Sequence, residues 1–147
     1  MFSTGKDDWE TPQNFYNKLD NEFHFTLDPC ATDTNHKCAK YYTEKENGLE
    51  QDWKGETVFV NPPYSTTAQN QWVKKCYEES IKNKNTKIVM LLPARTDVAR
   101  FHDYILHKAK IRFIRGRLTF EIGGKPVLGK NGKPQPAPFP SMLVIYN

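Results

Sequence analysis

The chain has 147 residues, of which 37% are hydrophobic, 13% aromatic and 26% charged. These values suit one folded domain. They exclude a disordered chain, which would be poor in aromatic residues, and a membrane-spanning one, because no apolar run approaches the ~20 residues that a spanning helix needs. The net charge of +4 is unevenly divided: residues 1–73 have 6 Lys and Arg against 12 Asp and Glu, and residues 74–147 have 15 against 5. The basic second half indicates a surface that faces a polyanion, although solvated Lys-rich helices would give the same count.

The first elements in chain order are a helix and a strand. Residues 12–21 predict a helix, because Pro12 suits a first turn, Thr11 can cap it, and apolar residues recur at helical spacing. Residues 23–27 alternate as a strand does, and they end at Asp28.

The next part of the chain contains the clearest strand. Residues 30–55 are polar, with one short strand expected around 39–43. Residues 57–60 are apolar and β-branched or aromatic, and the two prolines that follow stop the strand. Residues 67–82 then predict a helix with one broad apolar face.

A buried strand and a third helix follow. Residues 87–92 form a continuous apolar run that Pro93 ends, as expected of a central strand. Residues 97–108 predict a helix, with Thr96 as its N-cap and Asp97 at the positive end of its dipole.

Two strands, residues 117–122 and residues 142–146, complete the predicted elements. A long segment rich in glycine, proline and lysine joins them, and it contains the turn signal Asn131-Gly132. We therefore predict an α/β domain spanning 1–147, with a mainly parallel sheet and an antiparallel edge strand at the C-terminal end.

Three polar residues come directly after predicted strands: Asp28, Asn61 and Arg95. Ligands bind outside the carboxyl ends of the strands in sheets of this type. We therefore expect these three side chains to line one crevice.

The segment Asn61-Pro62-Pro63-Tyr64, which we call the NPPY turn, is the most informative motif. Its prolines fix φ and remove two backbone donors, so the turn is rigid and presents acceptors, the Asn61 side-chain oxygen and the Pro62 carbonyl. Two acceptors beside the Tyr64 ring suit a planar amino group, whose hydrogens they hold while its nitrogen attacks a methyl group in line. A base in a duplex must be flipped out to reach such a site.

The chain resembles the small phage-type DNA N6-adenine methyltransferases, a Dam-like family of phages and prophages. The resemblance covers nearly the whole chain and rests on the order of these segments: Trp9-Glu10-Thr11-Pro12, Leu27-Asp28-Pro29-Cys30-Ala31-Thr32, Gly48-Leu49, Gln51-Asp52-Trp53, Asn61-Pro62-Pro63-Tyr64-Ser65, Leu91-Leu92-Pro93-Ala94-Arg95, Gly116-Arg117-Leu118-Thr119-Phe120 and Pro138-Phe139-Pro140-Ser141.

This resemblance implies a Rossmann-like fold with S-adenosylmethionine as the methyl donor, and adenine in DNA as the methyl acceptor. It implies that the NPPY turn holds the adenine. The residues that it places at the cofactor are Trp9, Thr11 and Pro12 near the methionine part, then Asp28, Pro29, Cys30 and Ala31, and Asn61.

The chain departs from the usual methyltransferase pattern in two places. The turn after Asp28 contains small residues but no glycine, although glycine there lets the backbone approach the cofactor. The second strand does not end in a clear acidic residue for the cofactor ribose. Glu44, Glu46 and Asn47 are the candidates, and each also suits a solvated surface.

Basic residues in the last third of the chain are the best candidates for DNA phosphate contacts. We expect the loop 122–139 to reach the DNA, because long loops in small domains are often functional. The candidate residues are Lys110, Arg112, Arg115, Arg117, Lys125, Lys130 and Lys133. Arg95, which lies earlier in the chain after a predicted strand, is a further candidate.

Other chemistries have weaker support. Cys30, His36 and Cys38 lie close in sequence, but their spacing is not that of a zinc site, so we predict no metal. Three cysteines without secreted-type spacing fit reduced thiols. The first residues lack a secretion signal, so we expect the protein in the cytoplasm, that of the bacterial host if a phage encodes it.

Two alternatives stay open. The same turn serves enzymes that methylate N4 of cytosine or a glutamine side chain, and the basic half favours nucleic acid but does not separate adenine from cytosine. A catalytically silent DNA-binding module of the same fold is the second alternative. We predict no separate target-recognition domain, and a monomer or a homodimer.

Overall fold

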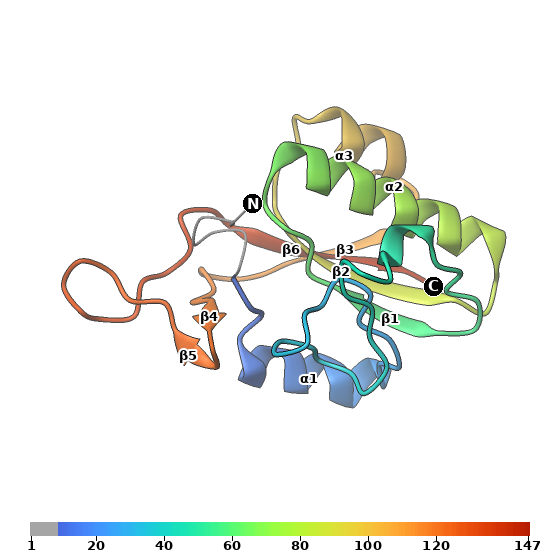
Figure 1. Ribbon diagram of the computed structural model, residues 1–147. Coiled ribbons are helices and arrows are strands. Elements are labelled where there is room, and N and C mark those ends of the chain that lie inside the picture. Colours follow the sequence, from blue (N-terminus) through green and yellow to red (C-terminus); the bar gives the residue numbers. More distant parts are fainter. Residues whose placement is uncertain (1–8) are drawn as a thin grey trace.

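A computed structural model describes residues 9–147, and the N-terminal eight residues, on which part of the localisation prediction rests, lie outside that range. The central sheet has the strand order β1-β2-β6-β3. β1 and β2 are parallel, and β6 is antiparallel to both of its neighbours, so β1, β2 and β3 run in one direction. The fold is therefore mixed α/β, as predicted (Figure 1). The strand bounds are β1 Thr57–Val60, β2 Lys87–Pro93, β3 Lys110–Phe113 and β6 Ser141–Tyr146.

The C-terminal part of the sheet differs from the prediction. β6 is the predicted antiparallel strand, but it lies between β2 and β3, so the prediction of an edge strand is wrong. β3 escaped prediction because it is itself an edge strand with three exposed residues of four, and so lacks an apolar pattern. The predicted strand 117–122 is wrong except for β4, Glu121–Ile122, which pairs with β5, Lys125–Pro126, in a separate hairpin.

The two earliest predicted strands are reduced to single bridges. Leu27 bridges Val58 in parallel, and Asp28 bridges Tyr41 in parallel. Phe23, the first residue of the predicted strand 23–27, belongs instead to the preceding helix. The amides of Thr26 and Leu27 both donate to the Thr57 carbonyl, so no regular ladder of hydrogen bonds forms. These segments nevertheless extend the sheet beyond β1 in the same direction.

The helices agree with the prediction at two of three positions. α1, Gln13–Phe23, and α2, Thr66–Lys82, lie within two residues of the predicted bounds, although Pro12 rather than Thr11 occupies the N-cap of α1. α3 is Ala99–Tyr104 only, with Val98 at its N-cap, so the prediction of Thr96 as the cap is wrong. Thr96 lies outside the helix, and its carbonyl oxygen lies 2.7 Å from the His102 Nε2. A short 3-10 helix, η1, spans Gly48–Glu50.

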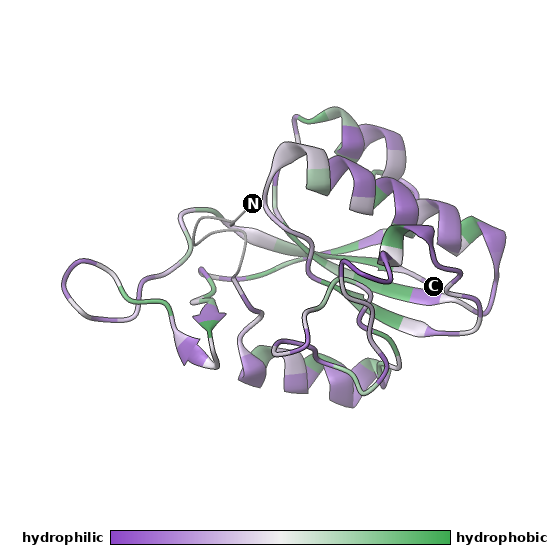
Figure 2. Cartoon of the chain, in the orientation of Figure 1, coloured by the Kyte–Doolittle hydropathy of each residue, from purple (hydrophilic) through white to green (hydrophobic). Residues whose placement is uncertain are grey.

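β1, β2 and β6 bury both of their faces, because helices cover the sheet on both sides (Figures 1 and 2). On β2, Ile88, Met90 and Leu92 face one hydrophobic cluster, and Val89 and Leu91 face the other. Burying each such side chain stabilises the fold by roughly 1.5–3 kcal/mol. The first cluster includes Trp72, Val73 and Cys76 of α2 with Phe101 of α3, and the second includes Tyr16 and Leu19 of α1. Among residues 9–147, no helix is long and apolar enough to cross a membrane.

Candidate cofactor and substrate cleft

A cleft of about 1040 Å³ opens beside the carboxyl end of β1, between that strand and the N-terminal segment. Sites for small organic ligands have volumes of roughly 300–1,000 Å³, so the cleft is large enough for a nucleoside-sized cofactor. It brings together most of the residues predicted at the cofactor: Trp9, Thr11, Asp28, Pro29, Cys30, Ala31 and Asn61.

Two of the predicted positions differ from this arrangement. Pro12 occupies the N-cap of α1, and it is not among the residues of 9–147 that line the cleft. Arg95 follows β2 at the same edge of the sheet as Asn61, but it is exposed and lies outside the cleft, so the expectation of a crevice shared with Asp28 fails for Arg95.

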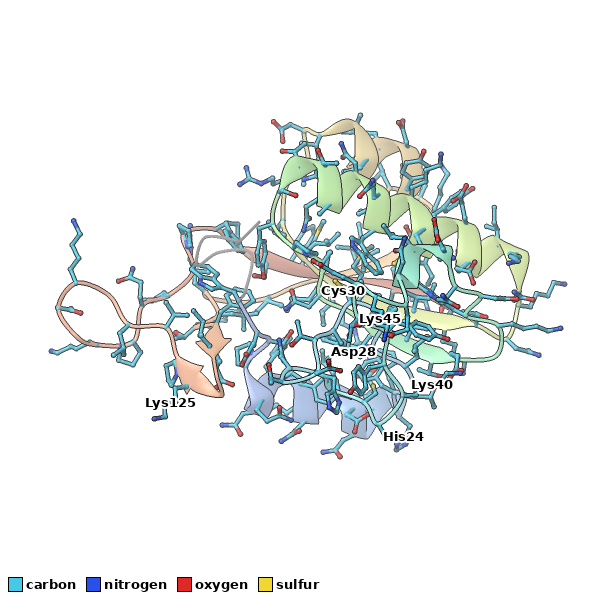
Figure 3. All side chains as sticks on the ribbon, viewed as in Figure 1. His24, Asp28, Cys30, Lys40, Lys45 and Lys125 are labelled. Carbon is cyan, nitrogen blue, oxygen red and sulfur yellow. The ribbon has the colours of Figure 1, made fainter. Side chains whose placement is uncertain are left out.

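Asp28 is a buried carboxylate on the wall of the cleft, 5% exposed. Its Oδ1 accepts from the Cys30 amide at 3.3 Å, and its Oδ2 accepts from the Lys37 amide at 2.9 Å. Burial raises the pKa of Asp28 to about 6, against the two hydrogen bonds and the nearby Lys37 ammonium, which act to lower it. A bound cation would favour the ionised form. Figure 3 shows Asp28 close to Cys30, where the chain leaves the sheet.

The glycine that is missing after Asp28 has a counterpart elsewhere in the cleft. Gly48 lies against the turn, and a Cβ at this position would meet the Pro29 carbonyl oxygen at 2.2 Å. The Trp53 ring nitrogen donates to the Gly48 carbonyl at 3.0 Å and holds it in place. A backbone segment without a side chain therefore closes this part of the cleft wall. Gly48 lies in one of the segments that resemble the family, but its sequence context alone indicates no role.

Thr11 has an unpartnered hydroxyl. The residue is 1% exposed and lines the cleft, yet its buried Oγ1 makes no hydrogen bond with residues 9–147. A buried hydroxyl without a partner costs free energy, so this atom marks a position for a polar ligand group. Lys37 also lines the cleft; burial lowers its pKa, while the carboxylates of Glu121 and Glu10 act to raise it.

The three candidates for an acidic cofactor contact differ in their environments. Glu46 accepts from the amide and the hydroxyl of Thr43, at 2.8 and 2.9 Å. The Asn47 side chain accepts from the Leu49 amide and caps η1. Glu44 lines the cleft, and its carboxylate makes no hydrogen bond with residues 9–147. Of the three, Glu44 is the one available to a ligand.

The side chain of Asn61 is oriented by its neighbours. Its Nδ2 donates to the Trp9 carbonyl at 3.1 Å, which fixes the amide with Oδ1 on the opposite side. The Tyr64 hydroxyl donates to that Oδ1 at 3.3 Å. Burial raises the pKa of the Tyr64 phenol, so the group stays protonated and donates. A carbonyl oxygen has two lone pairs, so Oδ1 can accept a second hydrogen.

Aromatic rings surround the NPPY turn. Tyr64 packs against Phe120 with ring centroids 5.7 Å apart and against Phe139 at 5.4 Å. Trp9 stacks on Phe120 at 5.4 Å and meets the Tyr64 ring edge-on at 6.1 Å. Phe120 and Phe139 were not predicted at the site, because they come from a segment that has little regular structure.

α2 supports the NPPY turn through the side chain of Gln69. Gln69 is 2% exposed, and its Nε2 donates to the Pro63 carbonyl at 2.8 Å. The Ser65 side chain caps α2 by accepting from the Ala68 amide. A glutamine on the apolar face of a helix was a signal in the sequence that the prediction did not use. Pro62 is buried, and within residues 9–147 no hydrogen bond uses its carbonyl.

The predicted DNA-contacting residues are exposed and divide into two groups. Arg95 and Arg115 both follow strands that run in the same direction as β1. Backbone hydrogen bonds from Ala94 and Ile114 reach the chain at the start of β6, so both arginines lie at the edge where the NPPY turn lies. Arg117 Nη1 donates to the Ala137 carbonyl at 3.3 Å. Lys110 is exposed on β3, and Arg112 is engaged by a double hydrogen bond with Glu22.

The second group lies on a projecting segment, residues 121–136, which we call the arm (Figure 1). It comprises the β4–β5 hairpin and the loop with the Asn131-Gly132 turn, in which Gly132 has φ 75°. Its basic residues, which we call the arm lysines, are Lys125, Lys130 and Lys133, and all three are exposed. Figure 3 shows Lys125 far from Asp28, on the side of the molecule where the arm projects.

The cysteines and histidines have other contacts. The Cys38 thiol lies 3.5 Å from the Tyr16 hydroxyl, and the His36 Nδ1 lies 2.8 Å from the Cys38 carbonyl oxygen. Burial raises the pKa of the Cys30 thiol. In residues 9–147, no group of three or more His, Cys, Asp or Glu residues is placed to hold a metal ion.

Comparison with known proteins identifies the family. A protein named DNA N-6-adenine-methyltransferase from Escherichia phage T1 is 35% identical over 121 residues, which are 81% of this chain and 49% of that protein. A protein of the same name from Haemophilus phage HP1 is 31% identical over 147 residues, which are 96% of this chain and 79% of that protein. The chain therefore spans about half the length of the T1 relative. The family model described as DNA N-6-adenine-methyltransferase (Dam) matches residues 2–147, and the chain belongs to this family.

Proposed function

We propose that this chain transfers a methyl group from S-adenosylmethionine to the N6 amino group of adenine in DNA. Membership of the Dam family and the names of both phage relatives support adenine in DNA as the substrate. The observation that carries the proposal is the NPPY turn beside a cleft whose wall includes Gly48 and the buried Thr11 hydroxyl, which has no partner within residues 9–147.

We further infer a Rossmann-like methyltransferase fold. The order of extended segments supports it: 41, then 27–28, then β1, β2, β6 and β3, with β6 alone running in the opposite direction. The cleft lies beyond the carboxyl ends of the first three, where such sheets bind nucleotides.

S-adenosylmethionine supplies an electrophilic methyl group on a sulfonium centre. The chain contributes recognition of its parts. The Thr11 hydroxyl and the Lys37 ammonium suit its carboxylate. The Asp28 carboxylate stabilises positive charge in the cleft, and the free Glu44 carboxylate suits two ribose hydroxyls.

The NPPY turn holds and orients the amino group. The Asn61 Oδ1 and the Pro62 carbonyl each accept one N6 hydrogen, which draws electron density onto the nitrogen and lowers the barrier to its attack. Tyr64 stacks on the flipped base. The Tyr64 hydroxyl keeps Oδ1 in position from its other side, and Gln69 keeps the turn against α2. The rigid turn supplies orientation without a metal or a covalent step.

Arg95, Arg115, Arg117 and the arm lysines are proposed to bind DNA phosphates. Their exposure and their position at the edge of the NPPY turn or on the arm support this assignment. Counterion release then makes DNA affinity fall steeply with salt.

The test is to incubate DNA with the protein and S-adenosylmethionine, digest it to nucleosides and identify the methylated species by mass spectrometry. N6-methyladenine is expected, and Asn61→Ala should reduce kcat by about 10²-fold or more, since it removes an acceptor aimed at developing charge. N4-methylcytosine alone would contradict the adenine assignment. Absence of any methylated nucleoside, with DNA still bound, would indicate a silent DNA-binding module.

A further inference from the structure

Glu10 has contacts that the proposed chemistry does not use. It belongs to the segment that lines the cleft, between Trp9 and Thr11. Its carboxylate points to the arm: Oε2 accepts from the Gly123 amide and Oε1 accepts from the Gly124 amide, both at 3.1 Å. One carboxylate thus satisfies two consecutive donors of the β4–β5 turn.

The backbone conformation of the β4–β5 turn explains why the Gly123 and Gly124 amides both face Glu10. Gly123 has φ 62° and Gly124 has φ 79°, the left-handed conformation that glycine adopts without strain. Two successive residues in that conformation make the tight hairpin turn and point both amides at Glu10. Hydrogen bonds to an ionised acceptor are roughly twice as strong as neutral ones.

The backbone fastens the same two segments. The amides of Glu10 and Glu121 each donate to the other residue's carbonyl, at 2.8 and 3.0 Å. The Glu121 Oε1 also accepts from the Gln13 amide at 3.2 Å, at the first residue of α1. The N-terminal cleft wall and the arm therefore behave as one unit where they meet.

This unit reaches both proposed ligands. On one side, the Trp9 carbonyl holds Asn61, and Trp9, Thr11 and Gly123 line the cleft. On the other side, backbone hydrogen bonds continue from Phe120 to Val127 and from Val127 to Gln135, into the part of the arm that carries two of the arm lysines.

We propose that Glu10 is a positioning residue that fastens the arm to the cofactor cleft, so that cofactor binding and DNA binding strengthen each other. A cofactor in the cleft immobilises the wall segment and, through Glu10, sets the arm in its DNA-binding position. Coupling of this kind is reciprocal: DNA must tighten cofactor binding by the same factor. The inference rests on the proposed function, in which the cleft binds the cofactor and the arm binds DNA.

The test measures the coupling rather than either affinity alone. The dissociation constant of a labelled DNA duplex is measured by fluorescence anisotropy with and without saturating S-adenosylhomocysteine. The reciprocal titration follows S-adenosylhomocysteine by calorimetry with and without DNA. For the unaltered chain, each affinity should rise by about fivefold or more when the other ligand is present, which is the usual lower size of such coupling.

Glu10→Ala should lower this ratio clearly, because it removes both side-chain hydrogen bonds to the β4–β5 turn and leaves only the backbone pair between residues 10 and 121. Glu10→Gln retains one acceptor oxygen and should give an intermediate ratio. Glu78→Gln is the matched control, because Glu78 is an exposed carboxylate on α2, away from both segments, and its ratio should stay unchanged. A merely structural role would weaken both ligands and leave the ratio as it was.

Two results separate the inference from the proposed function. If the unaltered chain binds neither S-adenosylhomocysteine nor DNA, the proposed function is wrong. If both bind but the ratio is one, or is the same in Glu10→Ala as in the unaltered chain, the role of Glu10 is wrong and the proposed function stands.

A measurement on the unaltered chain does not depend on the folding of any variant. Hydrogen exchange at the Gly123 and Gly124 amides should slow when S-adenosylhomocysteine is added, because the carboxylate that accepts from them becomes more firmly held. Exchange that is unaffected by the ligand would overturn the proposal.

Discussion

The buried carboxylate of Asp28 predicts how cofactor affinity depends on pH. In the free protein its pKa is raised to about 6 by burial. A ligand that carries positive charge binds the ionised form better, so the ligand is expected to bind less tightly as pH falls through this value. S-adenosylhomocysteine is a suitable probe, because its ammonium group stays charged throughout the range of interest.

The size of the effect follows from the pKa. With a pKa of about 6, about nine in ten molecules are ionised at pH 7 and about one in ten at pH 5. If the ligand requires the ionised form, its dissociation constant should rise about 10-fold between these two values.

The raised pKa of Asp28 also affects the stability of the free protein. A salt-bridged carboxylate has a lowered pKa and stabilises the fold when ionised, whereas ionised Asp28 has the opposite effect. Because the folded pKa of about 6 lies above the ordinary value of 3.8, ionising Asp28 destabilises the free fold. The contribution of the neutral acid to the free energy of unfolding is fully present below pH 3.8 and is lost as pH rises through about 6. The total loss is about 3 kcal/mol. A bound cation offsets this cost, so the cofactor should stabilise the protein more at pH 7 than at pH 5.

The assay is calorimetric titration of S-adenosylhomocysteine between about pH 5 and about pH 7.5, on the unaltered chain and on Asp28→Asn. Asparagine is neutral at every pH, so its profile should be flat. It should also bind less tightly at the upper end. Equal affinities at both ends for the unaltered chain would refute the assignment of Asp28 to the charged part of the ligand, as would the same slope in Asp28→Asn.

Three further predictions follow from other contacts. Gly48→Ala should destabilise the fold by about 2 kcal/mol or more, because its Cβ has no space beside Pro29; an unchanged melting temperature would show that the two segments separate easily. Gln69→Leu should lower kcat with little change in cofactor affinity, and should cost about 1–3 kcal/mol of stability for the unpaired Pro63 carbonyl; full activity would mean that the NPPY turn needs no support from α2. Replacing the arm lysines by alanine should reduce the slope of log affinity for DNA against log salt by about 3, whereas the same change at the exposed Lys84, beyond the far end of α2, should leave the slope unchanged.

The sequence predicted the parts of the fold whose pattern is local. β1, β2 and α2 have strong apolar periodicity and clear end signals, and the structure confirms them. β3 was missed because an edge strand with charged, exposed residues has no pattern to detect. The 117–122 prediction was wrong because apolar residues there serve the aromatic cluster around the NPPY turn, as Phe120 does, instead of a sheet.

The sequence predicted the site residues that belong to a recognisable motif. It did not predict the residues whose role arises from tertiary contacts. Asn61 could be placed because it follows β1, and Asp28 because it follows an extended segment that bridges β1 at Leu27. The roles of Glu10 and Gly48 depend on partners distant in sequence, the β4–β5 turn for one and Pro29 for the other. No local pattern contains such information.

The position of β6 has a consequence for how the sheet is assembled. β2 and β3 do not pair with each other, because β6 lies between them and pairs with both. β6 is synthesised after the other strands. One edge of β2 therefore stays unpaired while residues 94–140 are being made. An unpaired apolar strand is a template for association with other chains. Folding of the sheet should therefore be late and highly non-local, even though Asn61 and most of the residues that line the cleft lie in the first half of the chain.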